Sequence, residues 1–212
     1  MDIQFKRVTT QQDQETLAQL AHDIWNEYWP PLIGQDQVDY MVDQFQSLET
    51  IKRDMAQNGY EYWFITTTDP DDDINESEDI AEFDGLLGFG LLSDETPLGE
   101  QDVPLGFDGS EPRIIGYTGG HPEPETNRYF ISKIYLLADE RGHGVAKRVL
   151  TFYENHAREL GLGATYLTVN KHNDMAVRSY EKNGFKTIES VETDIGEGYI
   201  MDDFIMERPV SQ

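Results

Sequence analysis

The amino-acid sequence predicts one domain of mixed α/β class. Helix-type and strand-type patterns follow one another in the order β-α-α-β-β-β-α-β-α-β-β, assigned from the spacing of apolar residues. The second half contains strand–helix–strand units, the crossover connections of sheets that carry helices on their faces. A chain of 212 residues with 38% hydrophobic content is long enough for one domain with a substantial core.

Charge is the most unusual feature of the composition. Asp and Glu number 41 against 16 Lys and Arg, a formal net charge of −25. Such a surface repels nucleic acids and anionic membranes and attracts cations, so we expect neither nucleic acid nor membrane as a partner. The absence of cysteine excludes disulfides and a cysteine nucleophile. Without a membrane-length apolar run or a leader pattern, we expect a cytoplasmic protein.

The first part of the chain predicts a strand and then two helices. Residues 3–8 alternate as a strand does, and residues 12–28 place apolar side chains at helical spacing up to Trp29-Pro30-Pro31, where proline stops the helix. A second helical pattern begins near residue 38, and Asn58-Gly59 predicts its end.

The middle of the chain predicts a hairpin and an insertion. Residues 60–68 predict a strand with residues 85–92 as its hairpin partner, and an acidic loop, 69–84, connects them. Residues 93–127, rich in proline, glycine and acids, predict an insertion with a short strand at 114–117.

The spacing of oxygen-bearing side chains in the acidic loop is also compatible with a calcium site. Asp71, Asp73, Asn75, Asp79 and Glu82 have the spacing of a twelve-residue calcium loop. However, Glu76 stands where such a loop needs glycine for its turn. We therefore favour a solvated loop and expect no metal site.

The second half predicts alternating strands and helices. A strand at 129–137 leads through a glycine-rich loop into a helix that ends near Leu160. The remaining elements are a strand at 164–169, a helix at 174–182 and strands at 185–193 and 198–207.

The loop after residue 137 has the composition of a phosphate-binding turn. Small residues at 142, 144 and 146 let the backbone approach an oxyanion, and the first N–H groups of the following helix are unpaired. The simpler alternative is an ordinary strand-to-helix turn whose glycines serve tight geometry. Taken alone, the loop does not decide between the two.

A second constellation lies on the short helix at 174–182. Asn173 and Tyr180 are seven residues apart, close to two helical turns, so they project from the same side. Alone, they would be interpreted as an N-cap and a packed aromatic residue.

Together these two motifs resemble those of the Gcn5-related N-acetyltransferases (GNAT). Arg141, Gly144 and Ala146 match the phosphate loop of that family, and Asn173, Ala176, Tyr180, Gly184 and Phe185 match its second signature. The resemblance covers residues 129–208. It implies a central, mixed, mostly antiparallel sheet of about seven strands flanked by about four helices, in a single acetyltransferase domain.

By this resemblance the cofactor is acetyl-CoA. The pantetheine arm would pair with the backbone of Ile134, Tyr135 and Leu136, and Asn173 would contact the pantetheine region. Tyr180 would protonate the departing thiolate. The pyrophosphate would lie on the loop and helix start, whose residues are Arg141, Gly142, His143, Gly144, Val145, Ala146 and Lys147. Residues 126–138, 141–153 and 160–173 lack acidic side chains, so the local field can favour an anion in spite of the net charge.

The general base is the weakest point of the resemblance. Many members place a glutamate on the strand before the phosphate loop, and the corresponding residue here is Ser132. An amine near pKa ~10.4 is only about one part in 2,500 neutral at pH 7, so a base or a water relay is needed. Ser132 or Tyr135 acting through water, or a carboxylate such as Asp202 or Asp203, are the alternatives.

The first two helices supply the expected acceptor contacts. Trp25, Tyr28, Trp29 and Tyr40 offer aromatic faces, and Glu27, Asp36 and Asp39 lie near them, a combination that suits a small-molecule ammonium. The segments IWNEYWPPLI, YMVDQF and GYIMDDFIMER are similar to the branch that acetylates spermidine and related polyamines. A protein or peptide amine and an inactive CoA-binding module remain alternatives, and a homodimer is the assembly we consider.

Overall fold

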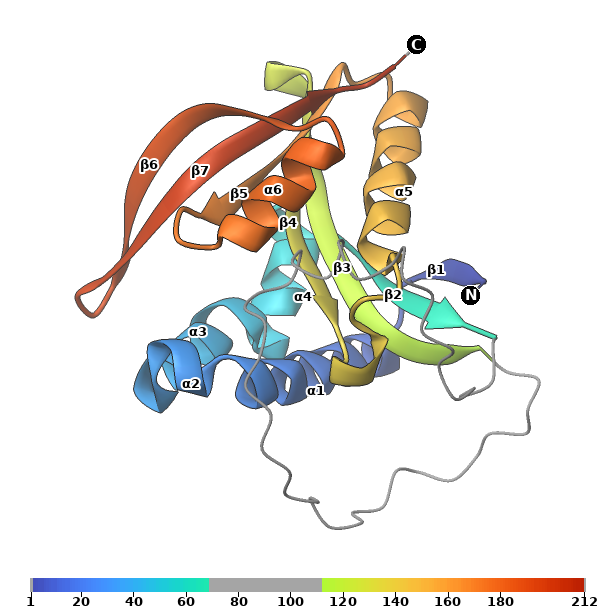
Figure 1. Ribbon diagram of the computed structural model, residues 1–212. Coiled ribbons are helices and arrows are strands. Elements are labelled where there is room, and N and C mark those ends of the chain that lie inside the picture. The colour runs from blue at the N-terminus through green and yellow to red at the C-terminus, as the bar shows by residue number, and fades with distance from the viewer. Residues whose placement is uncertain (1, 69–111, 212) are drawn as a thin grey trace.

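The computed structural model describes residues 2–68 and 112–211 (Figure 1). Its middle layer is a seven-stranded sheet in the order β1-β2-β3-β4-β5-β7-β6. Neighbouring strands are antiparallel except β4 and β5, which run parallel. This arrangement confirms the predicted fold class. The strands are β1 (Ile3–Arg7), β2 (Glu61–Thr67), β3 (Arg113–Glu123), β4 (Arg128–Leu136), β5 (Ala164–Asn170), β6 (Lys186–Gly196) and β7 (Tyr199–Pro209).

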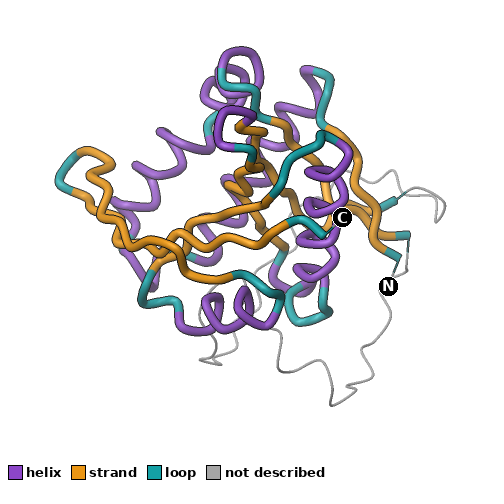
Figure 2. Tube along the Cα trace, turned by 90° about the horizontal axis from the view of Figure 1, so that it is seen from above, coloured by secondary structure: helices purple, strands orange, loops and turns teal. Residues whose placement is uncertain are grey.

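Helices cover both faces of the sheet (Figure 2). Helices α1 and α4 pack on one face through a buried cluster that includes Leu17, Ile51 and Tyr62, and α5 and α6 pack on the other through a cluster that includes Val149 and Tyr180. The helices are α1 (Gln11–Tyr28), α2 (Pro30–Ile33), α3 (Gln35–Gln46), α4 (Leu48–Gln57), α5 (Val145–Glu159) and α6 (Asp174–Lys182), with short 3₁₀ turns at Pro124–Thr126 and Ala138–Glu140.

The predicted second helix is two helices. Ser47 has an extended backbone, with φ −65° and ψ 155°, and its hydroxyl accepts a hydrogen bond from the Thr50 N–H as the N-cap of α4. Serine favours this capped conformation over the helix interior, and the apolar spacing continues across the break. The predicted end at Asn58-Gly59 is confirmed, because α4 ends at Gln57 with Asn58 as its C-cap.

Strand β3 corrects the predicted insertion. Eleven residues, Arg113–Glu123, form a central strand between β2 and β4, where we expected only a short strand at 114–117. The three glycines of β3 lower its strand propensity, but a side chain at Gly116 or Gly120 would collide with the neighbouring backbone of β4. The neighbours of β2 are β1 and β3, while the hairpin partner predicted at 85–92 and the acidic loop with its calcium spacing lie outside the described residues.

Within the described ranges, no helix combines the length and apolar character needed to cross a membrane.

Candidate active site

Strands β4 and β5 separate part-way along the sheet. Their parallel pairing joins only Arg128–Phe130 to Ala164–Tyr166. Farther along, Ile134, Tyr135 and Leu136 keep partners on β3 but have none on β5. The backbone of these three residues thus presents an open sheet edge. An extended arm can add to such an edge through backbone hydrogen bonds, as expected for pantetheine.

A bulge in β4 lies at this separation. The consecutive residues Gly119 and Gly120 of β3 pair with Lys133 and Ile131, so Ser132 is the extra residue. A bulge shifts the alternation of a strand, and both Ser132 and Lys133 consequently lie against Tyr60 on the side of α4.

The phosphate loop enters α5 through two left-handed glycines. Gly142 has φ +90° and Gly144 has φ +71°. Gly144 is the N-cap of α5 and supplies no side-chain hydrogen bond, so the first N–H groups of this fifteen-residue helix have no side-chain cap. His143 carries a buried Nδ1 atom that has no hydrogen-bond partner among the described residues. An uncapped helix start beside an unsatisfied polar atom fits the pyrophosphate of CoA.

The remaining loop residues divide between the core and the surface. Val145 and Ala146 are buried in the cluster beneath α5, so only their backbone N–H groups can face a phosphate. Lys147 is exposed on the first turn of α5 and adds a positive charge there.

Arg141 reaches away from the loop toward α1. Its Nη2 atom lies 2.6 Å from Oε2 of Glu27, and its Nε and Nη2 atoms donate to the Leu136 carbonyl at 3.2 and 3.1 Å. Its guanidinium lies 4.8 Å from the ring centre of Tyr28. The structure therefore unites a predicted cofactor residue with two predicted acceptor residues, Glu27 and Tyr28. Burial raises the pKa of Tyr28 to about 12, with Arg141 opposing and Glu27 adding to the shift.

Helix α6 presents Tyr180 toward β4. The Asn173 side chain caps the helix by accepting from the Ala176 N–H at 3.0 Å, so the N-cap role is observed directly. Tyr180 is buried, with its ring 5.7 Å from that of Phe185. Burial raises its pKa above the ordinary value and keeps the phenol protonated. Among the described residues its hydroxyl has no hydrogen-bond partner, and Tyr135 lies close enough for the two phenols to interact electrostatically.

The aromatic residues of α1 join the helix layer to β4. Trp25 is buried, with its ring 5.6 Å from Tyr135 and 5.4 Å from Trp29. The Tyr28 ring meets Trp29 edge to face at 5.1 Å. The Trp29 indole N–H is buried, and within the described part of the chain it has no hydrogen-bond partner. Trp25 thus forms a wall behind the cofactor strand, and Trp29 offers an unused donor.

Three residues near Ser132 were not predicted from the sequence: Tyr60, His121 and Lys133. The Tyr60 hydroxyl donates to Ser132 Oγ at 3.2 Å, and the His121 ring lies 4.7 Å from that of Tyr60. Lys133 is 7% exposed, with Nζ 5.4 Å from the Tyr60 ring centre. Burial lowers the pKa of Lys133 to about 8, although Asp54 opposes the shift. The sequence signal that could have revealed Lys133 is its position, because a lysine is unusual within the apolar run of β4.

The adjacent carboxylates of β7, Asp202 and Asp203, have different surroundings. Asp202 forms an ion pair with Lys171. Asp203 is 5% exposed, and no group in residues 2–68 or 112–211 forms a hydrogen bond with its buried Oδ1 atom. Burial raises the pKa of Asp203 to about 6, with Asp202 adding to the shift and Lys171 opposing it.

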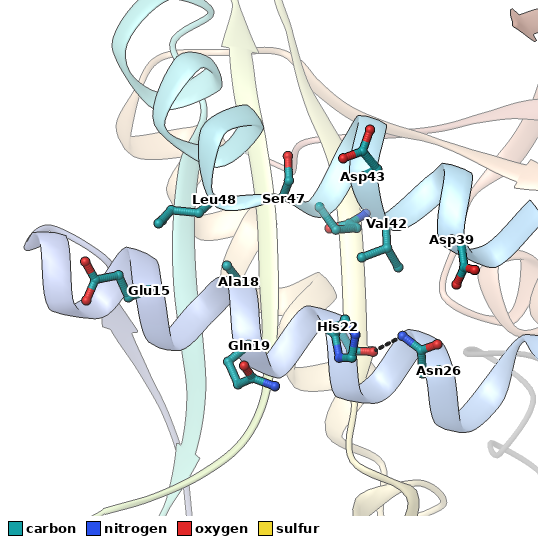
Figure 3. Close-up of a pocket in the computed structure, with 11 residues that line it drawn as sticks. Glu15, Ala18, Gln19, His22, Asn26, Asp39, Val42, Asp43, Ser47 and Leu48 are labelled. Atoms are coloured by element: carbon teal, nitrogen blue, oxygen red, sulfur yellow. Dashed lines mark hydrogen bonds between the residues drawn. The ribbon is translucent and has the colours of Figure 1, made fainter.

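An open groove of about 430 Å³ lies elsewhere, between α1 and α3 (Figure 3). Its walls carry three carboxylates, those of Glu15, Asp39 and Asp43, and also the His22 side chain. Of the residues expected to contact the acceptor, Asp39 lines this groove, whereas the described residues expected to contact the cofactor do not. We therefore place the candidate active site at the separation of β4 and β5, where the phosphate loop, Tyr180 and the bulge converge.

Comparison with known families agrees with this geometry. The model of the acetyltransferase (GNAT) family matches residues 21–185, more than half of the chain. The chain belongs to the GNAT family. The matched region contains β4, the phosphate loop and α6, and it ends at Phe185, the last residue of the second sequence signature. Acetyl-CoA is the cofactor that membership implies.

Related GNAT proteins extend the comparison. An uncharacterized N-acetyltransferase of Bacillus subtilis, YycN, is 35% identical over 88 residues, which cover 41% of this chain and 53% of the relative. The chain thus spans about half the length of this relative. The PaiA N-acetyltransferase of Thermoplasma acidophilum, solved in complex with coenzyme A, has a TM-score of 0.60 at 18% identity, covering 99% of both chains. A dodecameric spermidine N-acetyltransferase of Vibrio cholerae has a TM-score of 0.55 at 15% identity, covering 99% of this chain and 94% of the other. At these identities the solved structures establish a shared fold.

Proposed function

We propose that this GNAT protein transfers the acetyl group of acetyl-CoA to a primary amine of a small cationic molecule, by direct attack and without a metal ion. The observation that carries the proposal is the convergence of three features at one place: the open edge of β4, the uncapped start of α5 and the phenol of Tyr180 beside Tyr135. An acyl-CoA can span all three.

Two backbone segments would together bind acetyl-CoA. The backbone from Gly142 to Lys147 would hold the pyrophosphate, and the backbone of Ile134, Tyr135 and Leu136 would hold the pantetheine arm. When bound, the cofactor supplies a thioester carbonyl that an amine can attack.

Tyr180 would act as the acid. A phenol with a raised pKa stays protonated across the neutral range and can donate its proton to a thiolate whose conjugate acid has a pKa of ~8.5. Positioned acids of this kind typically contribute ~10²-fold or more to the rate.

A polyamine is the acceptor we favour. The net charge of −25 attracts polycations, and Trp29 and Glu27 lie near the end of α1 with aromatic and anionic groups that suit an ammonium. The fold shared with spermidine N-acetyltransferases is consistent with this choice.

We further propose a homodimer, which sedimentation of the purified protein tests.

Acceptor-dependent thiol release tests the proposal. The purified chain would be incubated with acetyl-CoA and, separately, with spermidine, an aminoglycoside and a peptide with a free N-terminus. We expect release with spermidine. If only the peptide causes thiol release, the acceptor is a protein or peptide amine and not a polyamine. If no amine causes release, an inactive CoA-binding module is favoured.

A further inference from the structure

Asp203 lies on the face of the sheet opposite to Tyr180. Side chains along β7 alternate between the two faces of the sheet, and those of Phe204 and Met206 pack into the cluster beneath α5 and α6. Asp203 pairs with Asn170 of β5 and points to the other face, the one that α1–α4 cover. Asp202, like Phe204, belongs to the α6 side.

Asp203 lies beside the part of β5 that extends beyond its pairing with β4. Asn170 is the last residue of β5, four residues beyond the end of its pairing with β4. On the helix side, the Tyr40 hydroxyl donates to the Ile195 carbonyl and its ring lies 5.4 Å from that of Tyr199, so α3 touches the tip of the β6–β7 hairpin. Asp203 thus lies between this contact and the separated strands.

Among the described residues, no side chain forms an ion pair or a hydrogen bond with the Asp203 carboxylate. Its Oδ1 atom is buried, and the described ranges supply no hydrogen-bond donor to it. Lys171, the nearby cation, is bound to Asp202, and the Asn170 side-chain oxygen accepts from the His172 N–H. Buried carboxylates are normally paired because removing the charge from water is costly, so an unpaired one suggests a ligand cation.

We propose that Asp203 binds the ammonium group of the acceptor and accepts the proton that exposes its lone pair. This inference rests on the proposed acetyl transfer. The ammonium gives one proton to Asp203, which passes it to solvent. The nitrogen then forms the C–N bond as the C–S bond breaks, and it loses a second proton to water while Tyr180 protonates the thiolate. Tyr180 regains its proton from water, so the net release is one proton. The products are the amide and the thiol.

The matched variants are Asp203→Asn and Glu192→Gln. Each removes one negative charge from the β6–β7 hairpin, but Glu192 is exposed on β6 and pairs in register with Asp202, on the face opposite to Asp203. Thiol release would be measured from pH 5.5 to 9 with spermidine, 1,4-diaminobutane and n-butylamine. Calorimetry would measure binding of the same amines to the CoA-bound protein.

We expect Asp203→Asn to lower kcat/KM about a hundredfold, to weaken amine binding and to leave CoA affinity unchanged. Glu192→Gln should stay within about threefold of the wild type, since the Glu192 side chain is exposed. If the wild type is active and the two variants have the same kcat/KM, the role of Asp203 is overturned, while the proposed acetyl transfer stands. If the wild type releases no thiol but binds the amine, weaker binding by Asp203→Asn still supports the site, whereas no amine binding by the wild type overturns it.

Discussion

Arg141 and Glu27 form a two-armed ion pair that joins the phosphate loop to the end of α1. Oε2 of Glu27 lies 2.6 Å from Nη2, and Oε1 lies 3.4 Å from Nη1. The same guanidinium binds the last carbonyl of β4, so one side chain connects the cofactor strand, the cofactor loop and the helix that carries the candidate acceptor residues.

Replacing Glu27 by Gln should release Arg141 toward the phosphate loop. The Glu27 side chain is 48% exposed, so the loss of stability should be small, about 1 kcal/mol or less. The freed positive charge should tighten CoA binding about two- to threefold and steepen its salt dependence. Calorimetry at two salt concentrations measures both. Glu15→Gln on the same helix is the control, and a tenfold loss of CoA affinity in Glu27→Gln would show instead that the ion pair holds the loop in place.

Replacing Tyr180 by Phe should reduce kcat about a hundredfold with little change in CoA affinity. The raised pKa further predicts that kcat of the wild type shows no loss from Tyr180 ionisation up to pH 9. Stopped-time thiol assays across pH give both results. Tyr153→Phe, which removes another buried phenol bonded to Thr118, should keep its turnover, and equal turnover in Tyr180→Phe and the wild type would exclude Tyr180 as the acid.

Glu61 should stabilise the fold in a pH-dependent way. Burial alone would raise its pKa, but His156 at 2.7 Å, Arg7 at 2.5 Å and the Tyr129 hydroxyl at 3.1 Å outweigh burial and lower it. A lowered folded-state pKa gives stability that is present above the unfolded pKa and is lost as the pH falls through the folded value.

Glu61→Gln should therefore lower the free energy of unfolding by about 1–2 kcal/mol at pH 7 and by less at pH 3. Urea denaturation at the two pH values measures the difference, with the exposed Glu159→Gln as control. An equal loss at both pH values would mean that the charge of Glu61 contributes nothing.

Asp203 should have the opposite effect on stability. Its pKa is raised to about 6 by burial, so the folded state favours the protonated form. Its contribution is then fully present below the unfolded pKa of 3.8 and lost as the pH rises through about 6. Asp203→Asn should raise the melting temperature by about 2–4 °C at pH 7.5 and change it little at pH 4. A lower melting temperature at pH 7.5 would reveal a structural partner for the carboxylate.

The sequence predicted local features well and long-range partners poorly. The Asn173 cap and the end of α4 at Asn58 depend on neighbouring residues, and both were found as expected. The break at Ser47 was missed because apolar spacing continues through it. Strand β3 was missed because its glycines are explained only by the closeness of β4, a contact between separate segments.

The candidate site divides in the same way. The glycines at 142 and 144 and the phenol at 180 were identified from short motifs. The partner of Arg141 is 114 residues away, and the unpaired state of Asp203 depends on the register of β5 against β7. No local pattern encodes either relationship.

Hydrogen–deuterium exchange with and without CoA tests most directly whether the separated strands and the phosphate loop form the cofactor site. We predict that CoA slows exchange at the amides of residues 134–136 and 142–147, because the cofactor would occupy the open edge of β4 and the uncapped start of α5. Unchanged exchange there, with protection instead around the α1–α3 groove, would contradict this location of the active site.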